Sequence, residues 1–181
     1  GYSPEQGLYD VAYPTGFLNF DSLNGYKLNC YNDKGEITPV THRGILDGSY
    51  NLLIGRSGSG KSTFAVQAAA NIINQFPDAE MVIQSMEGGI TIPRLETLTG
   101  YIGQDLFNHV SIKNSGITAE SIYDDIYTIY ETKLKNKDKL MYDTGMRDST
   151  GNPITKFIPT VMIIDSIALL APERIADKGD L

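Results

Sequence analysis

Cysteine and tryptophan are almost missing from this chain. Its 181 residues include one cysteine, Cys30, and no tryptophan. A single cysteine cannot form a disulfide within the chain, which excludes the disulfide-framework class of small secreted domains. No apolar run approaches the roughly 20 residues that a membrane-spanning helix needs, and no secretory signal is visible. We therefore expect a cytoplasmic protein with no membrane partner.

An excess of positive charge is lacking as well. Lys and Arg number 15 and Asp and Glu number 22, for a net charge of −7. This balance excludes a uniformly basic surface that binds nucleic acid, although it is compatible with a local basic site. Hydrophobic residues make up 41% of the chain and charged residues 20%, which is the composition of a globular protein. The length suits one α/β domain with a sizeable core.

The most informative segment is a glycine-rich loop between an apolar run and a helical pattern. Residues 50–54 predict a short buried strand, and residues 62–75 repeat apolar side chains at helical spacing. The loop between them matches G-x-x-x-x-G-K-[ST]. Glycine allows positive φ angles and a close approach of phosphate to the backbone, and the following helix adds its positive dipole end. The residues expected to bind nucleotide phosphates are Gly55, Arg56, Ser57, Gly58, Ser59, Gly60, Lys61, Ser62 and Thr63.

Two of these loop residues have distinct expected roles. Lys61 would reach the β- and γ-phosphates of the nucleotide, and the Ser62 hydroxyl would bind Mg²⁺. A glycine-rich turn that only connects a strand to a helix is the alternative interpretation. The complete pattern between a strand and a helix favours phosphate binding.

Strand and helix patterns alternate along the rest of the chain. Further strands are expected over residues 80–84, 108–112 and 160–165, and helices over residues 91–100 and 118–135. This alternation predicts an α/β fold with a mostly parallel sheet and helices on both faces. Turn residues predict hairpins near residues 33–35 and over 143–159. In the longer helix, Tyr123, Tyr127 and Tyr130 share a helical spacing and are expected to pack in the core.

Two acidic residues follow expected strands at the edge of the sheet where the loop lies. Parallel sheets bind ligands beyond the carboxyl ends of their strands. Asp165 ends one strand and can hold a water of the Mg²⁺ shell while orienting Ser62, although aspartate also caps turns routinely. Glu87 follows another strand and can position the water that attacks a γ-phosphate. A surface glutamate at a turn is the alternative for Glu87.

Taken in order, these segments resemble the ATPase core of the RecA-type recombinases, nearest to the phage UvsX-like branch. The resemblance starts at Thr15-Gly16 and continues through the loop at residues 55–62, which matches the Walker A motif. Glu87-Gly88-Gly89 is similar to the family's catalytic segment. Residues 164–173 (IDSIALLAPE) are similar to its Walker B strand and to the start of its first DNA-binding loop.

This resemblance implies a P-loop NTPase fold of RecA-like type and a division of the chain. Residues 1–14 would form an N-terminal arm or linker, and residues 15–181 an ATPase core with an added hairpin near residues 141–159. The chain begins with Gly1 and ends within the expected DNA-binding loop. We therefore expect a truncated ATPase core, in which hydrolysis is weak or absent.

The resemblance also implies activity, cofactors and partners. ATP and Mg²⁺ would bind at the loop, with Glu87 and Lys61 as catalytic residues and Ser62 and Asp165 at the metal. Thr91 and Arg94 fall where the family contacts the adenine base, although an aromatic residue is common there. The complete protein would filament on single-stranded DNA and promote homologous pairing and strand exchange.

Two other functions share the same core. A hexameric replicative helicase would form rings, and its relatives usually carry a tyrosine directly after the Walker B aspartate, where this chain has Ser166. A regulatory ATPase that does not act on DNA, of the KaiC-like kind, is the third interpretation. Stimulation of ATP hydrolysis by single-stranded DNA separates it from the first two.

Overall fold

Three separate sheets organise the chain in the computed structural model, which describes residues 10–170. A short antiparallel sheet pairs β1 (Ala12–Tyr13) with β4 (Ile45–Leu46). An antiparallel sheet has the order β3-β2-β7-β8, from β2 (Tyr26–Tyr31), β3 (Ile37–His42), β7 (Met141–Arg147) and β8 (Pro153–Phe157). A parallel sheet has the order β6-β5-β9, from β5 (Glu80–Ser85), β6 (Val110–Lys113) and β9 (Thr160–Asp165).

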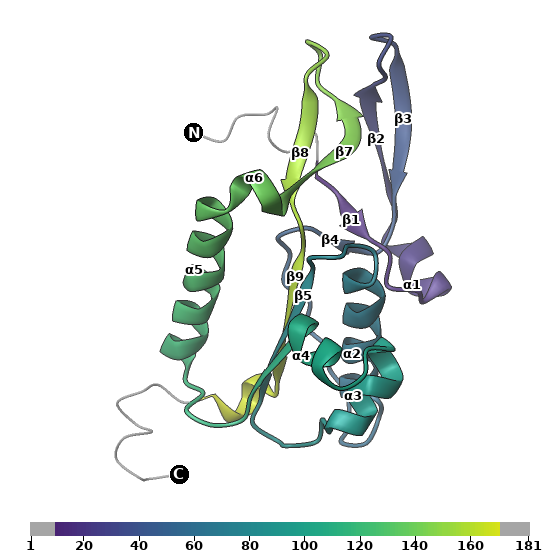
Figure 1. Cartoon of the computed structure of the whole chain (residues 1–181). Coiled ribbons are helices and arrows are strands. Elements are labelled where there is room, and N and C mark those ends of the chain that lie inside the picture. The colour runs from purple at the N-terminus through teal and green to yellow at the C-terminus, as the bar shows by residue number, and fades with distance from the viewer. Residues whose placement is uncertain (1–9, 171–181) are drawn as a thin grey trace.

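The predicted mostly parallel sheet is therefore wrong, and with it the RecA-like fold class. Only three strands of the described chain are parallel, and the remaining strands pair antiparallel in two other sheets. Two hairpins explain the difference. Gly35 and Gly151 take positive φ angles of 76° and 86° in tight turns. Each turn therefore joins two adjacent antiparallel strands, whereas parallel strands would need a helical crossover between them. The β2–β3 and β7–β8 hairpins project together at the top of Figure 1.

The strand predicted over residues 50–54 is also absent. This segment has no regular secondary structure, and Tyr50, Leu52 and Ile54 are 94%, 69% and 87% exposed. No strand among residues 10–170 pairs with it. An apolar run forms a buried strand only when a neighbouring strand satisfies its backbone groups, and none does so here.

Six α-helices and one short 3₁₀ turn complete the described chain: α1 (Leu18–Leu23), α2 (Lys61–Ile73), α3 (Ile92–Thr99), α4 (Gln104–His109), α5 (Ala119–Lys135), α6 (Lys137–Leu140) and η1 (Ile167–Leu169). Local signals explain several boundaries. Pro93 stands in the first turn of α3. Thr118 and Ser121 form a reciprocal capping box at the start of α5. Phe17 is the N-cap residue of α1 and makes no side-chain capping bond.

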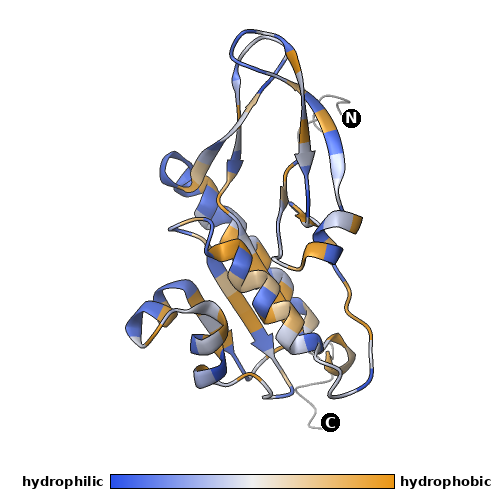
Figure 2. Cartoon of the chain, turned by 90° about the vertical axis from the view of Figure 1, so that its right-hand side faces the viewer, coloured by the Kyte–Doolittle hydropathy of each residue, from blue (hydrophilic) through white to orange (hydrophobic). Residues whose placement is uncertain are grey.

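The main core lies between α2 and the parallel sheet. Val66, Ala69 and Ile73 of α2 pack with Met81 and Ile83 of β5, all at most 2% exposed. Small alanine side chains let the helix approach the sheet closely, and hydrophobic residues line α2 in Figure 2. In Figure 1, α5 lies on the side of the parallel sheet opposite to α2. Helices therefore flank both faces of this small parallel sheet.

A second core joins the hairpin sheet to α2. Tyr13, Cys30 and Met146 are buried together with Ile72 of α2. Of the residues expected to form an N-terminal arm, Tyr13 is thus a packed part of the fold, and residues 1–9 lie outside the described region. Arg147, the last residue of β7, forms an ion pair with Asp33 of the β2–β3 turn at 3.2 Å, which links the two hairpins.

Candidate functional site

The glycine-rich loop lies directly before α2 and is open to solvent. Gly58 and Gly60 take positive φ angles of 73° and 88°, and no atom lies within 4 Å of the position that a Cβ would occupy at either residue. Gly60 is the N-cap of α2 and provides no side-chain hydrogen bond to the helix. The first N–H groups of this 13-residue helix are therefore available to an anion, and the helix dipole favours negative charge at that point.

Lys61 turns back over the start of the loop. Its Nζ donates hydrogen bonds to the carbonyl oxygens of Gly55 at 3.1 Å and Arg56 at 3.0 Å. Glycine at position 55 lets Ser59 fold close to the start of the loop, because a Cβ there would lie 2.8 Å from the Ser59 Oγ. The only ammonium group in the loop is thus held beside the backbone that would surround a phosphate.

Ser62 and Asp165 meet where α2 starts and β9 ends. The Ser62 Oγ donates a 2.8 Å hydrogen bond to Asp165 Oδ2. The parallel pairing of β5 with β9 ends at Ser85 opposite Asp165, and the backbone N–H of Met86 donates to the Asp165 carbonyl at 2.7 Å. The carboxylate and the hydroxyl therefore share one small region beside the loop.

Glu87 reaches the same edge of the parallel sheet. Its backbone N–H lies 3.4 Å from the Asp165 carbonyl oxygen, and its side chain is exposed. Gly88, next in the chain, takes a positive φ of 66° and turns the backbone away from the strand. The structure thus places the Glu87 backbone beside the Ser62–Asp165 pair, with its carboxylate free to face solvent or a ligand.

Arg94 and Thr91, the expected base contacts, belong to α3. The Arg94 guanidinium donates a hydrogen bond to the Thr63 hydroxyl on the first turn of α2. Thr91 is the exposed N-cap residue of α3 and makes no side-chain capping bond. Arg94 is therefore connected to α2, whereas within residues 10–170 Thr91 forms no hydrogen bond with another predicted site residue.

Two buried polar residues at the end of β5 were not singled out from the sequence. Gln84 and Ser85 are 1% and 2% exposed, and neither Gln84 Oε1 nor Ser85 Oγ has a hydrogen-bond partner. The Gln84 amide nitrogen donates to Asp125 Oδ2 at 2.6 Å, and Lys113 pairs with the same carboxylate at 3.1 Å. The signal available in the sequence was the change from an apolar run to Gln-Ser just before Glu87. Buried polar atoms without partners are rare and often accompany functional sites.

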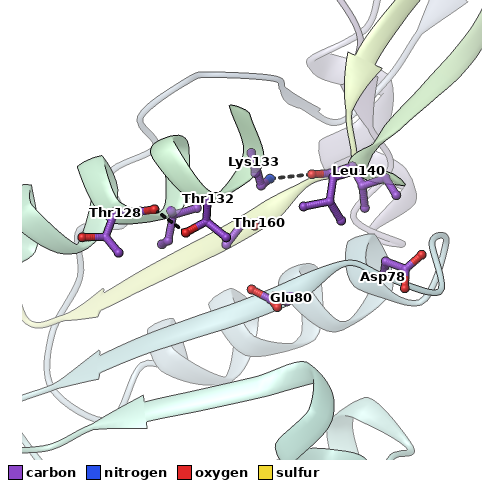
Figure 3. Close-up of a pocket in the computed structure, with 9 residues that line it drawn as sticks. Asp78, Glu80, Thr128, Thr132, Lys133, Leu140 and Thr160 are labelled. Carbon is purple, nitrogen blue, oxygen red and sulfur yellow. Dashed lines mark hydrogen bonds between the residues drawn. The ribbon is translucent and has the colours of Figure 1, made fainter. Parts of the chain in front are cut away.

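A cavity of about 170 Å³ lies at the opposite end of the parallel strands (Figure 3). Glu80 and Thr160, at the starts of β5 and β9, line it together with Lys133 of α5. The Lys133 Nζ donates to the Ile158 carbonyl at 2.5 Å. Burial lowers the pKa of Lys133, and the nearby carboxylates of Asp47 and Glu80 oppose that shift. Because ligands of parallel sheets bind beyond the carboxyl ends of the strands, this cavity is separate from the loop site.

The groups around the loop fit Mg²⁺ bound together with a nucleotide. Magnesium prefers oxygen ligands and commonly uses one or two protein groups plus phosphates and waters. Ser62 and Asp165 offer a hydroxyl and a carboxylate of this type. Among residues 10–170, no group of three or more His, Cys, Asp and Glu side chains is arranged to hold a metal without such a ligand.

Comparison with known proteins identifies no relative of this chain. No protein-family model matches the sequence, and no curated protein or solved structure is significantly similar to it. None of the helices between residues 10 and 170 combines the length and hydrophobicity that crossing a bilayer requires.

Proposed function

We propose that this protein binds ATP with Mg²⁺ at the glycine-rich loop and hydrolyses it. The observation that supports this most is the 2.8 Å hydrogen bond between Ser62 and Asp165, located beside an open loop that also holds Lys61. A loop that served only to lead into α2 would need neither a carboxylate at this point nor an ammonium group over its carbonyls.

Each residue has a role in this proposal. The loop N–H groups and the start of α2 hold the phosphates, and Lys61 exchanges its carbonyl contacts for phosphate oxygens. Ser62 and Asp165 hold the metal and its water shell, and Mg²⁺ supplies neutralisation of phosphate charge when it is bound. The Glu87 carboxylate positions a water in line with the γ-phosphate and accepts its proton. Arg94 contacts the base from α3.

Binding measurements on the 181-residue chain test this proposal. Calorimetric titration with MgATP should show saturable binding, and Lys61→Ala should weaken it by about ten- to a hundredfold, as expected for loss of a charge-assisted contact. Lys139→Ala, which removes an exposed lysine of α6, is the matched control and should bind normally. Equal affinity of the Lys61 and Lys139 variants would refute the site.

The proposed function also includes a role on single-stranded DNA. The order of the motifs supports a recombinase ATPase that self-associates into a helical filament and promotes strand exchange in the cytoplasm, or in the host cytoplasm for a phage protein. Residues 171–181, which include part of the expected first DNA-binding loop, lie outside the described region. The replicative helicase and the DNA-independent regulatory ATPase remain the alternatives.

Two measurements on the full-length protein separate these possibilities. Single-stranded DNA should stimulate ATP hydrolysis if the protein acts on DNA, and an unchanged rate would favour the regulatory ATPase. Electron microscopy of the protein on single-stranded DNA with ATP should show helical filaments for a recombinase. Closed rings would favour the helicase.

A further inference from the structure

The outer face of α5 carries an exposed stripe of large side chains. Tyr123, Tyr127, Tyr130 and Leu134 are 70%, 56%, 53% and 41% exposed. Their spacing of four, three and four residues places them on one side of the helix. This finding corrects the expectation that the three tyrosines pack in the core. In Figure 1, α5 lies at the margin of the molecule, with no other described element on its outer side.

Contacts on other faces of α5 fix this orientation. Ile122 is 6% exposed, and Asp125 accepts hydrogen bonds from Gln84 of β5 and Lys113 of β6. Lys133 reaches the Ile158 carbonyl just before β9. Because these three residues hold α5 against the sheet, rotation of the helix cannot bury the tyrosines. The stripe needs a partner from elsewhere or remains in water.

Charge along α5 indicates what kind of partner fits. The first half of the helix carries Asp124 and Asp125, and its end carries Lys133 and Lys135, followed by two more lysines in α6. An acidic first half and a basic second half complement a second copy of the same helix running in the opposite direction. Nucleic acid fits less well, because Asp124 and Glu131 flank the tyrosines and repel phosphates.

We infer that α5 pairs antiparallel with α5 of a second copy of this chain to form a two-fold symmetric dimer. With Tyr130 at the symmetry axis, the helical repeat places Tyr127 against Leu134 of the partner subunit. The same register brings Asp124 of each copy toward Lys135 of the partner subunit. Lys135 is available for this contact, since its side chain is 74% exposed and its ion pair with Glu131, one helical turn away, is long at 3.8 Å.

This contact is distinct from the filament proposed above. An isologous contact uses the same patch on both copies and closes at two subunits, whereas a filament needs two different patches. It also needs no nucleotide, because α5 and the glycine-rich loop are separate elements. One helix pair is smaller than a standard interface, so we expect a weak dimer with a dissociation constant in the micromolar range or above.

Sedimentation equilibrium of the 181-residue chain, without nucleotide and up to about 1 mM, covers the expected affinity range. The mass should rise from monomer to dimer and no further. Tyr130→Lys places two like charges at the axis and should abolish the dimer, whereas Tyr50→Lys, the same change at a tyrosine 94% exposed, should leave it intact. A monomer at every concentration, growth beyond the dimer, or equal behaviour of the two variants would overturn the inference.

Charge exchange tests the register. Asp124→Lys and Lys135→Asp should each weaken the dimer by about threefold to tenfold, because each creates two like-charge contacts. The double variant restores opposite charges across the interface and should recover most of the affinity. If the loss of affinity in the double variant instead equals the product of the fold-changes in the two single variants, the two residues do not interact and this register is excluded.

Cross-linking gives a second measure of the register. Tyr130→Cys should form a disulfide-linked dimer under mild oxidation, because its symmetry mate lies directly opposite. The native Cys30 is 3% exposed and should not interfere. Thr128→Cys, on the same helix but turned away from the stripe, is the control. Faster cross-linking at position 128 than at position 130 would overturn the proposed pairing.

Discussion

The Ser62 hydroxyl donates a 2.8 Å hydrogen bond to the Asp165 carboxylate across 103 residues of sequence. Ser62 lies in the first turn of α2, and Asp165 is the last residue of β9. The packing of α2 on the parallel sheet therefore assembles this pair, rather than any local turn. Within the described chain it is the contact that most directly joins the glycine-rich loop to an acidic group able to hold a metal.

The first prediction concerns the metal. Asp165→Asn keeps a hydrogen-bond acceptor for Ser62 but removes the negative charge, so the increase in ATP affinity that Mg²⁺ produces should fall by about ten- to a hundredfold. Affinity for ATP without Mg²⁺ should change little. Titrations with and without the metal measure both quantities. Asp105→Asn, at a carboxylate 60% exposed on α4, is the control. A normal Mg²⁺ effect in Asp165→Asn would exclude this carboxylate from the metal site.

The second prediction concerns Glu87. Glu87→Gln preserves size and hydrogen bonding but removes the base, so ATP should bind normally while hydrolysis falls by about a hundredfold or more. Single-turnover measurements with the protein in excess are suited to slow hydrolysis. Glu36→Gln, an exposed glutamate beside the β2–β3 turn, should hydrolyse ATP at the normal rate. Equal rates for the two variants would leave Glu87 as a surface residue of a turn.

The third prediction separates base contact from support of the loop. The Arg94 guanidinium hydrogen-bonds Thr63, and in the function proposed above its plane also stacks on adenine. If it contacts the base, Arg94→Ala should weaken ATP by about threefold to thirtyfold and leave the affinity for inorganic triphosphate unchanged. Competition binding with both ligands tests this, with Arg43→Ala at an exposed arginine as the control. An equal loss for both ligands would show that Arg94 acts only through the loop.

Local sequence patterns predicted the individual helices and strands better than they predicted how the strands pair into sheets. The helix after Lys61, the strand from Glu80 and the strand ending at Asp165 all form where the sequence indicated. Each has a strong local signal: a glycine N-cap with alanine-rich packing, or a short apolar run between turn residues. Such signals act within a few residues, so they can be read without knowing what lies beside them.

Partners distant in sequence explain what could not be predicted. Residues 50–54 look like a strand, but no described strand lies beside them and they remain exposed. Tyr127 and Tyr130 have the spacing of core residues, yet Asp125 binds Gln84 and turns the opposite face inward. In both cases the outcome depends on which residues become neighbours. The contact between Ser62 and Asp165 was expected only because both were assigned to one edge of a parallel sheet.

The last prediction concerns pH and the turn of the β7–β8 hairpin. Asp148 accepts hydrogen bonds from the Thr150 hydroxyl and from the backbone N–H groups of Thr150 and Asn152. These bonds, led by that from the Thr150 hydroxyl, lower the pKa of Asp148 from 3.8 to about 2. A carboxyl whose pKa is lower in the folded state binds its proton more readily when unfolded. Its stabilising effect is therefore complete above pH 3.8 and is lost as the pH falls through about 2.

Nuclear magnetic resonance of the Asp148 carboxyl can follow this titration directly. Thr150→Ala removes the largest contribution and should move the pKa of Asp148 back toward 3.8. Amide exchange in the turn should then accelerate at a higher pH than in the native chain, because the protonated carboxyl accepts these bonds less well. Thr155→Ala, at an exposed threonine of β8, should leave both readings unchanged. A native Asp148 that titrates near 3.8 would show that the turn does not hold its carboxylate in solution, and the hairpin would then rely on strand pairing alone.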